Sequence, residues 1–240
     1  MSTTAVPALR LVSFADLEGR LWGGALDAGA GPAVVVGGTD AEHCTAPGTI
    51  ALATDGDIWR LTGDGIDLAV TSDEPVPAPG DGATLCTVTG TISAGAGSVT
   101  VNCPGTRSSG PGDAHLGSLR SVTGWFGPEL ALSLQALRAP RCEGHQADRV
   151  RATLFGAEDM RPVDEPRLST TFSADDLPTR MSLELWVGKG EDLYPRRAAG
   201  EARGPAVRVS AAGLELAGVP LTCHASGLTG VGVYLLARFT

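Results

Sequence analysis

The sequence predicts an all-β protein built from two antiparallel halves, and three observations lead to this prediction. Of its 240 residues, 33 are glycine and 16 are proline, and they are spread along the chain. Because both residue types interrupt helices, they favour short strands joined by tight turns. Apolar and polar residues alternate along many short segments such as Met181–Val187, which is the pattern of a half-buried strand. A helical pattern is limited to one short turn at Ser173–Leu177.

Strands are expected where a short apolar or alternating segment lies between turn residues. The pairs Asp55-Gly56 and Asp64-Gly65 mark hairpin turns, since Asp-Gly adopts the positive φ angles that such turns need. In chain order, the expected strands are Gly19–Leu26, Ala33–Val36, Thr49–Ala53, Ile58–Leu61, Ile66–Thr71, Thr84–Ser93, Ser98–Val101, Leu119–Phe126, Leu130–Arg138, Val150–Phe155, Arg167–Phe172, Met181–Val187, Ala198–Ala202, Val207–Val209, Pro220–His224 and Val233–Phe239.

The polar stretch Cys103–Gly117 divides these strands into two groups of similar size. It is rich in Gly, Ser and Pro, which is typical of a connection between domains. We therefore expect an N-terminal β domain over residues 1–104, a seam over 105–117 and a C-terminal β domain over 118–240. Sheets of this size bury their apolar faces by closing into barrels or stacking as sandwiches, and a barrel of about eight strands can hold one small ligand.

Charge and hydropathy exclude several classes of partner. The formal net charge is −9, so the surface repels phosphate backbones and anionic lipids, and we expect neither a nucleic-acid nor a membrane partner. The sequence contains no apolar run near the roughly 18 residues of a spanning helix, and its first residues lack the pattern of a signal peptide. A cytoplasmic location is expected. It also agrees with five widely spaced cysteines and no C-x-x-C motif, a pattern typical of free, mostly buried thiols.

Metal and cofactor sites are not expected either. The sequence lacks a G-x-S-x-G elbow, a P-loop, a G-x-G-x-x-G motif after a strand and an H-E-x-x-H motif. Cysteine and histidine lie close together at His43-Cys44, Cys142-x-x-His145 and Cys223-His224. However, neighbours on a strand face opposite ways, so each adjacent pair offers only one ligand to a common point. The Asp-Gly pairs at residues 55–56 and 64–65 are explained more simply as hairpin turns than as parts of a calcium-binding site.

One strand carries a carboxylate whose environment could be unusual. Glu184 and Trp186 share the polar-looking face of Met181–Val187. If this face points into a barrel, desolvation raises the pKa of Glu184, and the protonated carboxyl can act as a general acid. The alternative is that the face is solvent-exposed and Trp186 covers a neighbouring strand.

Other candidate groups also carry two interpretations. Arg107 is either an exposed charge in the seam or a group that reaches the cleft between the halves. Segment Tyr194–Glu201 (YPRRAAGE) is either a surface charge cluster or a site that binds a substrate carboxylate through Arg196 or Arg197. Large aromatic side chains on strands, such as Trp22 and Trp125, either form core or line an apolar cavity.

Four segments of the second half, Glu165–Thr171, Leu183–Trp186, Tyr194–Glu201 and Gly230–Tyr234, resemble the two-domain lipocalin-like family in its actinobacterial members. The family groups AttH-like proteins with carotenoid hydratases of the hydroxyneurosporene synthase type. Its fold is shared by tocopherol cyclase-like proteins and some fungal decalin-forming cyclases. The resemblance implies two β-barrel-like domains with an apolar pocket in or between them. It also implies ring closure or hydration of polyene, polyketide or isoprenoid substrates without a redox cofactor.

The junction of the halves departs from the family pattern. Family members often carry an R-x-H-x-W-G element there, and Gly105-Thr-Arg107 resembles its start. Ser109 and Pro111 stand where the histidine and the tryptophan are expected, and His115 lies further along the chain. The departure argues against the hydratase chemistry of the family.

These observations favour a cofactor-independent cyclase or isomerase of natural-product biosynthesis, which folds an apolar polyketide or isoprenoid in a barrel pocket and promotes ring closure. The alternatives are a non-catalytic lipocalin-like binder of an apolar metabolite and a structural β-sandwich. The expected partner is an apolar small molecule, with a homodimer left open. The expected polar groups are Glu184, Tyr194, Glu201, Arg107 and His224, and the expected substrate-binding walls are Trp22, Trp125, Trp186 and Phe126.

Overall fold

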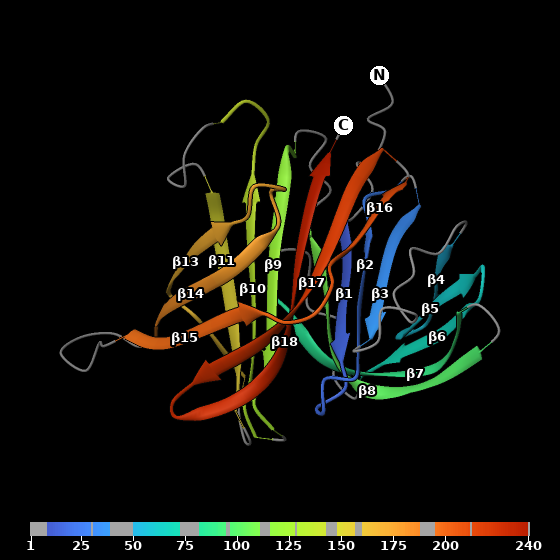
Figure 1. Ribbon diagram of the computed structural model, residues 1–240, viewed down its shortest axis with the longest axis horizontal. Helices are drawn as coiled ribbons and strands as arrows, with labels where there is room; N and C mark the ends of the chain where they lie inside the picture. Colours follow the sequence, from blue (N-terminus) through green and yellow to red (C-terminus); the bar gives the residue numbers. More distant parts are fainter. Residues whose placement is uncertain are drawn as a thin grey trace.

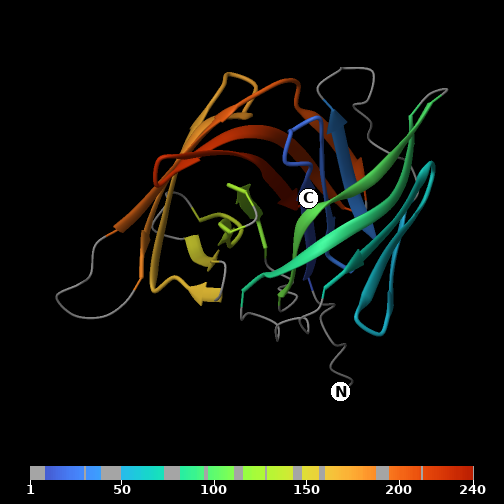
Figure 2. The same cartoon turned by 90° about the horizontal axis from the view of Figure 1, so that it is seen from below.

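The structure, a computed structural model, describes residues 9–29, 31–38, 50–72, 82–94, 97–110, 116–127, 129–142, 148–156, 160–187, 195–211 and 213–239. In these ranges the regular elements are all β-strands, and they form two curled antiparallel sheets that lie side by side (Figures 1 and 2). The predicted all-β fold with two curled halves is confirmed. None of the described segments forms a helix with the length and hydropathy needed to cross a bilayer.

The N-terminal sheet has eight strands in the order β3-β2-β1-β8-β7-β6-β5-β4. Its first strand therefore lies inside the sheet, paired with β2 on one side and β8 on the other. The strands are β1 (Leu9–Ala15), β2 (Leu21–Asp27), β3 (Pro32–Gly38), β4 (Ala51–Asp55), β5 (Ile58–Gly63), β6 (Ile66–Thr71), β7 (Thr84–Ala94) and β8 (Gly97–Gly110).

The C-terminal sheet has ten strands, nine of them in the order β12-β11-β10-β9-β18-β17-β15-β14-β13, with β16 paired to β17 beside this path. The last strand, β18, lies inside the sheet between β9 and β17. The strands are β9 (Ser118–Trp125), β10 (Ala131–Arg138), β11 (Asp148–Phe155), β12 (Met160–Pro162), β13 (Glu165–Phe172), β14 (Pro178–Trp186), β15 (Pro195–Ala202), β16 (Val207–Ala211), β17 (Leu214–Ala225) and β18 (Leu228–Phe239).

The two sheets pack against each other through their convex faces. Alternate residues of β1 and β18, among them Leu11 and Leu235, meet in one core that both sheets share. The residues between them, such as Phe14 and Tyr234, point to the concave side of their own sheet. Because these central strands are buried on both faces, their residues are buried almost without interruption.

Glycines allow the two sheets to approach each other closely across the shared core. A Cβ on Gly24 of β2 would lie 2.5 Å from Leu235 Cδ1, and one on Gly218 of β17 would lie 2.6 Å from Trp22 Cζ3. Both separations are shorter than van der Waals contact, so a side chain at either position would push the sheets apart.

Buried polar contacts also join the halves. The Thr106 and Thr123 hydroxyls lie 3.3 Å apart. Gln135 Nε2 donates to Ser108 Oγ at 2.5 Å, and Arg151 donates to the Gln135 carbonyl at 2.8 and 3.0 Å. These polar groups therefore satisfy one another inside the interface between the sheets.

The expected seam is partly wrong. Gly105–Gly110 is the end of β8 and pairs with β1, from Phe14 opposite Gly105 to Leu9 opposite Gly110. Residues 111–115 lie outside the described ranges. Two strands were not expected from the sequence, β1 and the short β12.

Candidate functional site

A cleft opens where the two sheets diverge beyond their shared core. Its volume is about 550 Å³, within the range of small-molecule sites. Its walls are mainly apolar and come from both halves, with Leu17, Leu85 and Pro104 on the N-terminal side and Trp125, Leu130 and Phe155 on the C-terminal side. We call this hollow the inter-sheet cleft.

Two leucines in the inter-sheet cleft are exposed to solvent. Leu17, in the turn between β1 and β2, is 48% exposed, and Leu85 of β7 is 39% exposed. The Ser72 hydroxyl donates a hydrogen bond to the Leu85 carbonyl oxygen at 2.6 Å and so holds the backbone of Leu85 in place. Exposed apolar groups that line a concavity are a common feature of binding surfaces in proteins.

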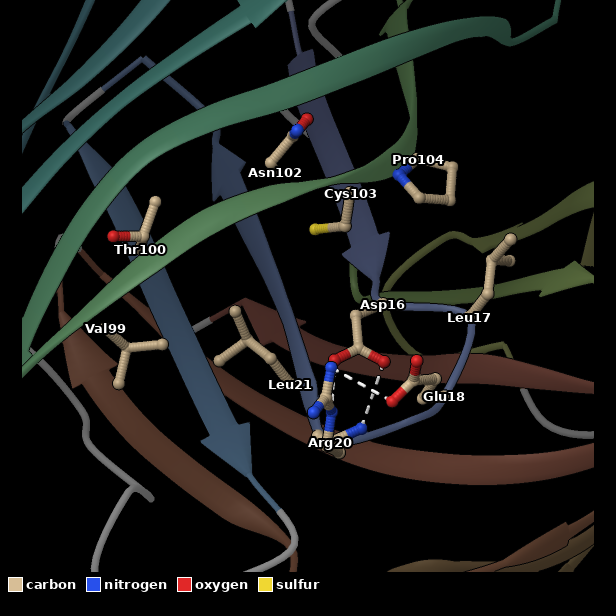
Figure 3. Close-up of a pocket in the computed structure, with 10 residues that line it drawn as sticks. All are labelled: Asp16, Leu17, Glu18, Arg20, Leu21, Val99, Thr100, Asn102, Cys103 and Pro104. Atoms are coloured by element: carbon tan, nitrogen blue, oxygen red, sulfur yellow. Dashed lines mark hydrogen bonds and ion pairs between the residues drawn. The ribbon is translucent and has the colours of Figure 1, made fainter.

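A second hollow, of about 610 Å³, adjoins the inter-sheet cleft (Figure 3). The two share Leu17, Asn102, Cys103 and Pro104 along their boundary. The second hollow lies between the β1–β2 turn and β8, and the charged side chains of the turn gather at one end of it (Figure 3). The combined space is thus apolar at one end and polar at the other.

The polar end is organised by the β1–β2 turn. Asp16 Oδ1 accepts a hydrogen bond from the backbone N–H of Arg20 at 3.2 Å, and the Arg20 guanidinium lies 3.5 Å from Asp16 Oδ2. Glu18 pairs with the same guanidinium at 3.0 Å. Gly19, at φ 70°, takes the left-handed conformation on which this tight turn depends. The Arg203 guanidinium also lies against Gly19, so this end of the hollow holds charges of both signs.

The two thiols near the cleft are inert at neutral pH. Burial raises the pKa of Cys103 to about 12, and the negative charge of Asp16 contributes in the same direction. Burial raises the pKa of Cys86 to about 12 as well, although the nearby Arg107 opposes the shift. Since the thiolate is the nucleophilic form, these side chains act as walls. Polar side chains that line the two hollows include the Asn102 carboxamide and the Asp16 carboxylate.

Among the predicted site residues that the structure describes, Trp125 is the one in the cleft wall. Its side chain is 2% exposed, and its Nε1 has no hydrogen-bond partner in the described part of the chain. A buried indole N–H without an acceptor is unusual, because such groups normally find a partner. The indole nitrogens of Trp22 and Trp186 share this feature.

Arg107 lies neither in a loop nor in the inter-sheet cleft. It is fully buried on the concave side of the N-terminal sheet, where its Nη1 donates to the Asp57 carbonyl. Its guanidinium also lies 5.6 Å from the centre of the Trp59 ring, in a cation–π contact. Both interpretations drawn from the sequence placed this residue wrongly.

Glu184 lies on the outer face of the C-terminal sheet. The inward side chains of β14 are Met181, Leu183 and Leu185, so Glu184 points away from the barrel interior and, of the two interpretations, the solvent-facing one describes its position. Its side chain is 38% exposed, between Arg167 at 3.8 Å and Arg197 at 3.4 Å. The carboxylate is therefore held by two cations in contact with solvent.

The same outer face holds other predicted residues. His224 lines one hollow with Glu184, and its Nδ1 lies 3.1 Å from Thr229 Oγ1. The Arg167 guanidinium lies 5.8 Å from the centre of the Trp186 ring, in a cation–π contact. Glu201 is exposed and pairs with Arg180 at 3.1 Å. The hollow that Glu184 and His224 line has a volume of about 690 Å³ and shares no lining residue with the inter-sheet cleft, and Trp186 and Glu201 lie outside its lining.

The remaining predicted residues occupy cores or lie outside the described ranges. Trp22 is buried in the core shared by the sheets, and Phe126 in the core of the C-terminal sheet. Tyr194, His43, Cys44 and His145 belong to segments that the structure does not describe.

Sequence reasoning missed the residues that line the two adjoining hollows, above all Leu17, Leu85 and Asn102 in the inter-sheet cleft and Asp16 in the second hollow. An available signal was the segment Asp16–Arg20, in which Gly19 and charged residues separate two apolar runs as a hairpin turn does. Recognising β1 would have placed this turn, and with it Leu17 and Asp16, at the end of a hairpin.

No protein-family model matches the chain, and no curated protein matches it in sequence. Several solved structures share its two-half lipocalin-like fold. An AttH-like protein from Nitrosomonas europaea has a TM-score of 0.62 and 10% identity, over 96% of this chain and 91% of that one. Kievitone hydratase from Nectria haematococca has a TM-score of 0.61 and 9% identity, over 97% and 89%. CghA, solved alone and with Sch210972, has a TM-score of 0.59 and 13% identity, over 97% and 88%.

Proposed function

We propose that this protein is a divergent member of the two-domain lipocalin-like family that binds an apolar, flexible small molecule in the inter-sheet cleft and promotes its cyclisation or isomerisation without a cofactor. The observation that carries the proposal is the cleft itself, in which exposed Leu17 and Leu85 face the buried aromatic walls Trp125 and Phe155.

The shape of the cleft favours catalysis by restricting the conformations of the bound ligand. A flexible chain folded against apolar walls loses conformational freedom before it reacts, and this lowers the barrier to ring closure. Asn102, at the boundary of the two hollows, can donate a hydrogen bond to a carbonyl oxygen of the ligand, and Asp16 can accept a proton at the polar end.

The structural comparisons support the proposal through what the similar proteins bind or do. CghA holds the small molecule Sch210972, and kievitone hydratase is by its name an enzyme of small-molecule chemistry. The fold shared with them makes a ligand site in this chain a reasonable inference, while the lining residues argue for an apolar ligand.

Binding can be tested with the neutral fluorophore N-phenyl-1-naphthylamine. We expect saturable binding that Leu17→Asp weakens by about 10-fold or more, because a carboxylate in the apolar wall loses solvation when the ligand binds. Leu228→Asp is the matched control, since Leu228 is 46% exposed beside the β17–β18 turn and lies outside the cleft. Equal affinity of the two variants for the fluorophore would show that it does not bind in the inter-sheet cleft.

The alternative is a non-catalytic carrier of an apolar metabolite, which the same cleft would suit. Mass spectrometry of molecules carried through native purification identifies the ligand. Incubation of the extracted ligand, or of its acyclic precursor, with fresh protein then separates the two functions. Conversion to an isomer of equal mass supports a cyclase, whereas unchanged release supports the carrier.

A further inference from the structure

We propose that the open end of the C-terminal half-barrel is a second binding site, which takes a small organic carboxylate. A hollow of about 220 Å³ lies there, on the concave side of β9, β10 and β18. This volume corresponds to the liquid volume of roughly seven water molecules, so the site admits only a small ligand.

The strand register brings three arginines together at this hollow. Ser118 of β9 lies opposite Arg138 of β10 on one side and opposite Arg238 of β18 on the other. Arg120 follows on the next inward position of β9, opposite Leu236. All of these line the hollow, because the inward positions of the same strands continue into the core of the C-terminal sheet.

Among the residues that the structure describes, the three arginines at this hollow are paired with two carboxylates, Asp148 and Asp176. Asp148 is 2% exposed and binds both Arg120 and, at 2.6 Å, Arg138 Nε. One carboxylate between two guanidiniums, one of them 7% exposed, leaves a positive charge in a poorly solvated place. Arg238 has the exposed Asp176 as its partner at 3.3 Å, and Glu215, which lies opposite Arg238 on β17, pairs with a further arginine, Arg208, at 3.5 Å. An anion in the hollow would balance the surplus charge.

The rest of the lining selects an organic anion. Phe172, which is 36% exposed, and Leu236 form apolar walls beside the guanidiniums. A planar guanidinium can bind a carboxylate through two parallel hydrogen bonds, while the phenyl ring packs against an apolar body. A benzoate-like acid satisfies both requirements, and a bare inorganic anion satisfies only the first.

This site is separate from the inter-sheet cleft. The two hollows share no lining residue, and β9 presents Arg120 to one and Trp125 to the other from its opposite faces. A ligand at one site can therefore be tested without disturbing the other.

The experiment is calorimetric titration of the full chain with benzoate, benzamide and inorganic phosphate. We expect benzoate to bind and benzamide to bind at least 10-fold more weakly, since the amide lacks the charge. We expect Arg238→Gln to weaken benzoate binding by about 10-fold and Phe172→Ala to weaken it by several-fold. Arg180→Gln is the control, because Arg180 forms a comparable exposed pair, with Glu201 at 3.1 Å, on the outer face.

Three results would each overturn the proposal: equal affinity for benzoate and benzamide, an unchanged affinity in Arg238→Gln, or phosphate binding as strong as benzoate binding. Fluorophore binding in the inter-sheet cleft and the thermal unfolding midpoint should stay unchanged in Arg238→Gln, which excludes misfolding as the cause. If the protein binds the fluorophore but not benzoate, the second site is contradicted and the proposed function is not. If it binds benzoate but not the fluorophore, the proposed function is contradicted and the second site is not.

Discussion

Gly218 of β17 leaves open the space into which the Trp22 indole of β2 projects, so that a tryptophan and a glycine on different sheets fit together as one contact. A Cβ on Gly218 would lie 2.6 Å from the indole and 2.7 Å from Val35 Cγ2. Neither neighbour can retreat, since both are buried in the core shared by the sheets.

Substitution of this glycine should therefore destabilise the protein. We expect Gly218→Ala to lower the free energy of unfolding by about 1–3 kcal/mol through overpacking. Gly124→Ala is the control, because a Cβ there would meet Phe126 at 3.4 Å, an ordinary contact. Urea unfolding of both variants measures the difference, and equal midpoints would show that the sheets can separate without cost.

The buried thiols should make the protein less stable at alkaline pH. Burial raises the pKa values of Cys86, Cys103 and Cys223 from the ordinary 9.0 to about 12. Above pH 9 the unfolded chain loses these protons and the folded chain keeps them, so the free energy of unfolding should fall as the pH rises from 9 to 12.

Two variants isolate this effect in urea titrations between pH 8 and pH 11. Cys223→Ala removes one buried thiol and should make the decline with pH shallower. Cys142→Ala removes an exposed thiol and should leave it as in the original protein. A decline of the same steepness in all three proteins would assign the pH effect to other groups.

The buried carboxylate at the C-terminal half-barrel should matter more for stability than exposed ones. Asp148→Asn leaves Arg120 and Arg138 without their shared counter-charge, and we expect a loss of about 3 kcal/mol. Glu201→Gln breaks an exposed pair with Arg180 and should cost about 0.5 kcal/mol or less. Thermal or urea unfolding compares them, and similar losses would mean that Asp148 is not the organising charge.

The outer position of Glu184 gives a prediction about function. Glu184→Gln should leave fluorophore binding in the inter-sheet cleft, and conversion of the identified ligand, unchanged, because its side chain faces solvent between Arg167 and Arg197. Asp16→Asn, in the second hollow, should reduce conversion, because the variant lacks the carboxylate that we propose accepts a proton. A large loss of activity in Glu184→Gln with native unfolding behaviour would return this residue to the catalytic site.

Sequence patterns identified strands well where one face is solvated. In β14 the alternation separates Met181, Leu183 and Leu185 from their polar neighbours, and these three are the inward residues. In β1 the alternation disappears, because Leu11 faces the other sheet while Phe14 faces its own concave side. A strand that is buried on both faces has no polar residues alternating with its apolar ones, so its sequence lacks the pattern by which half-buried strands are recognised.

The end of β8 was mistaken for a linker for a related reason. Its glycines and serines are needed for close packing, since a Cβ on Gly105 would lie 2.9 Å from the Ser13 carbonyl oxygen. Small residues in a tight sheet have the same composition as a flexible connection. The inter-sheet cleft could not be predicted at all, because it forms where two sheets diverge and no local pattern records that angle.

The place of β18 inside its sheet has a consequence for biosynthesis. Trp125 of β9 pairs with Val231 of β18, roughly a hundred residues later in the chain. At a translation rate of about 5–20 residues per second, β9 waits roughly 5–20 s on the ribosome for the strand that completes its pairing. During that interval the apolar faces that will become the shared core are uncovered, so the nascent chain should depend on chaperones more than the finished protein does.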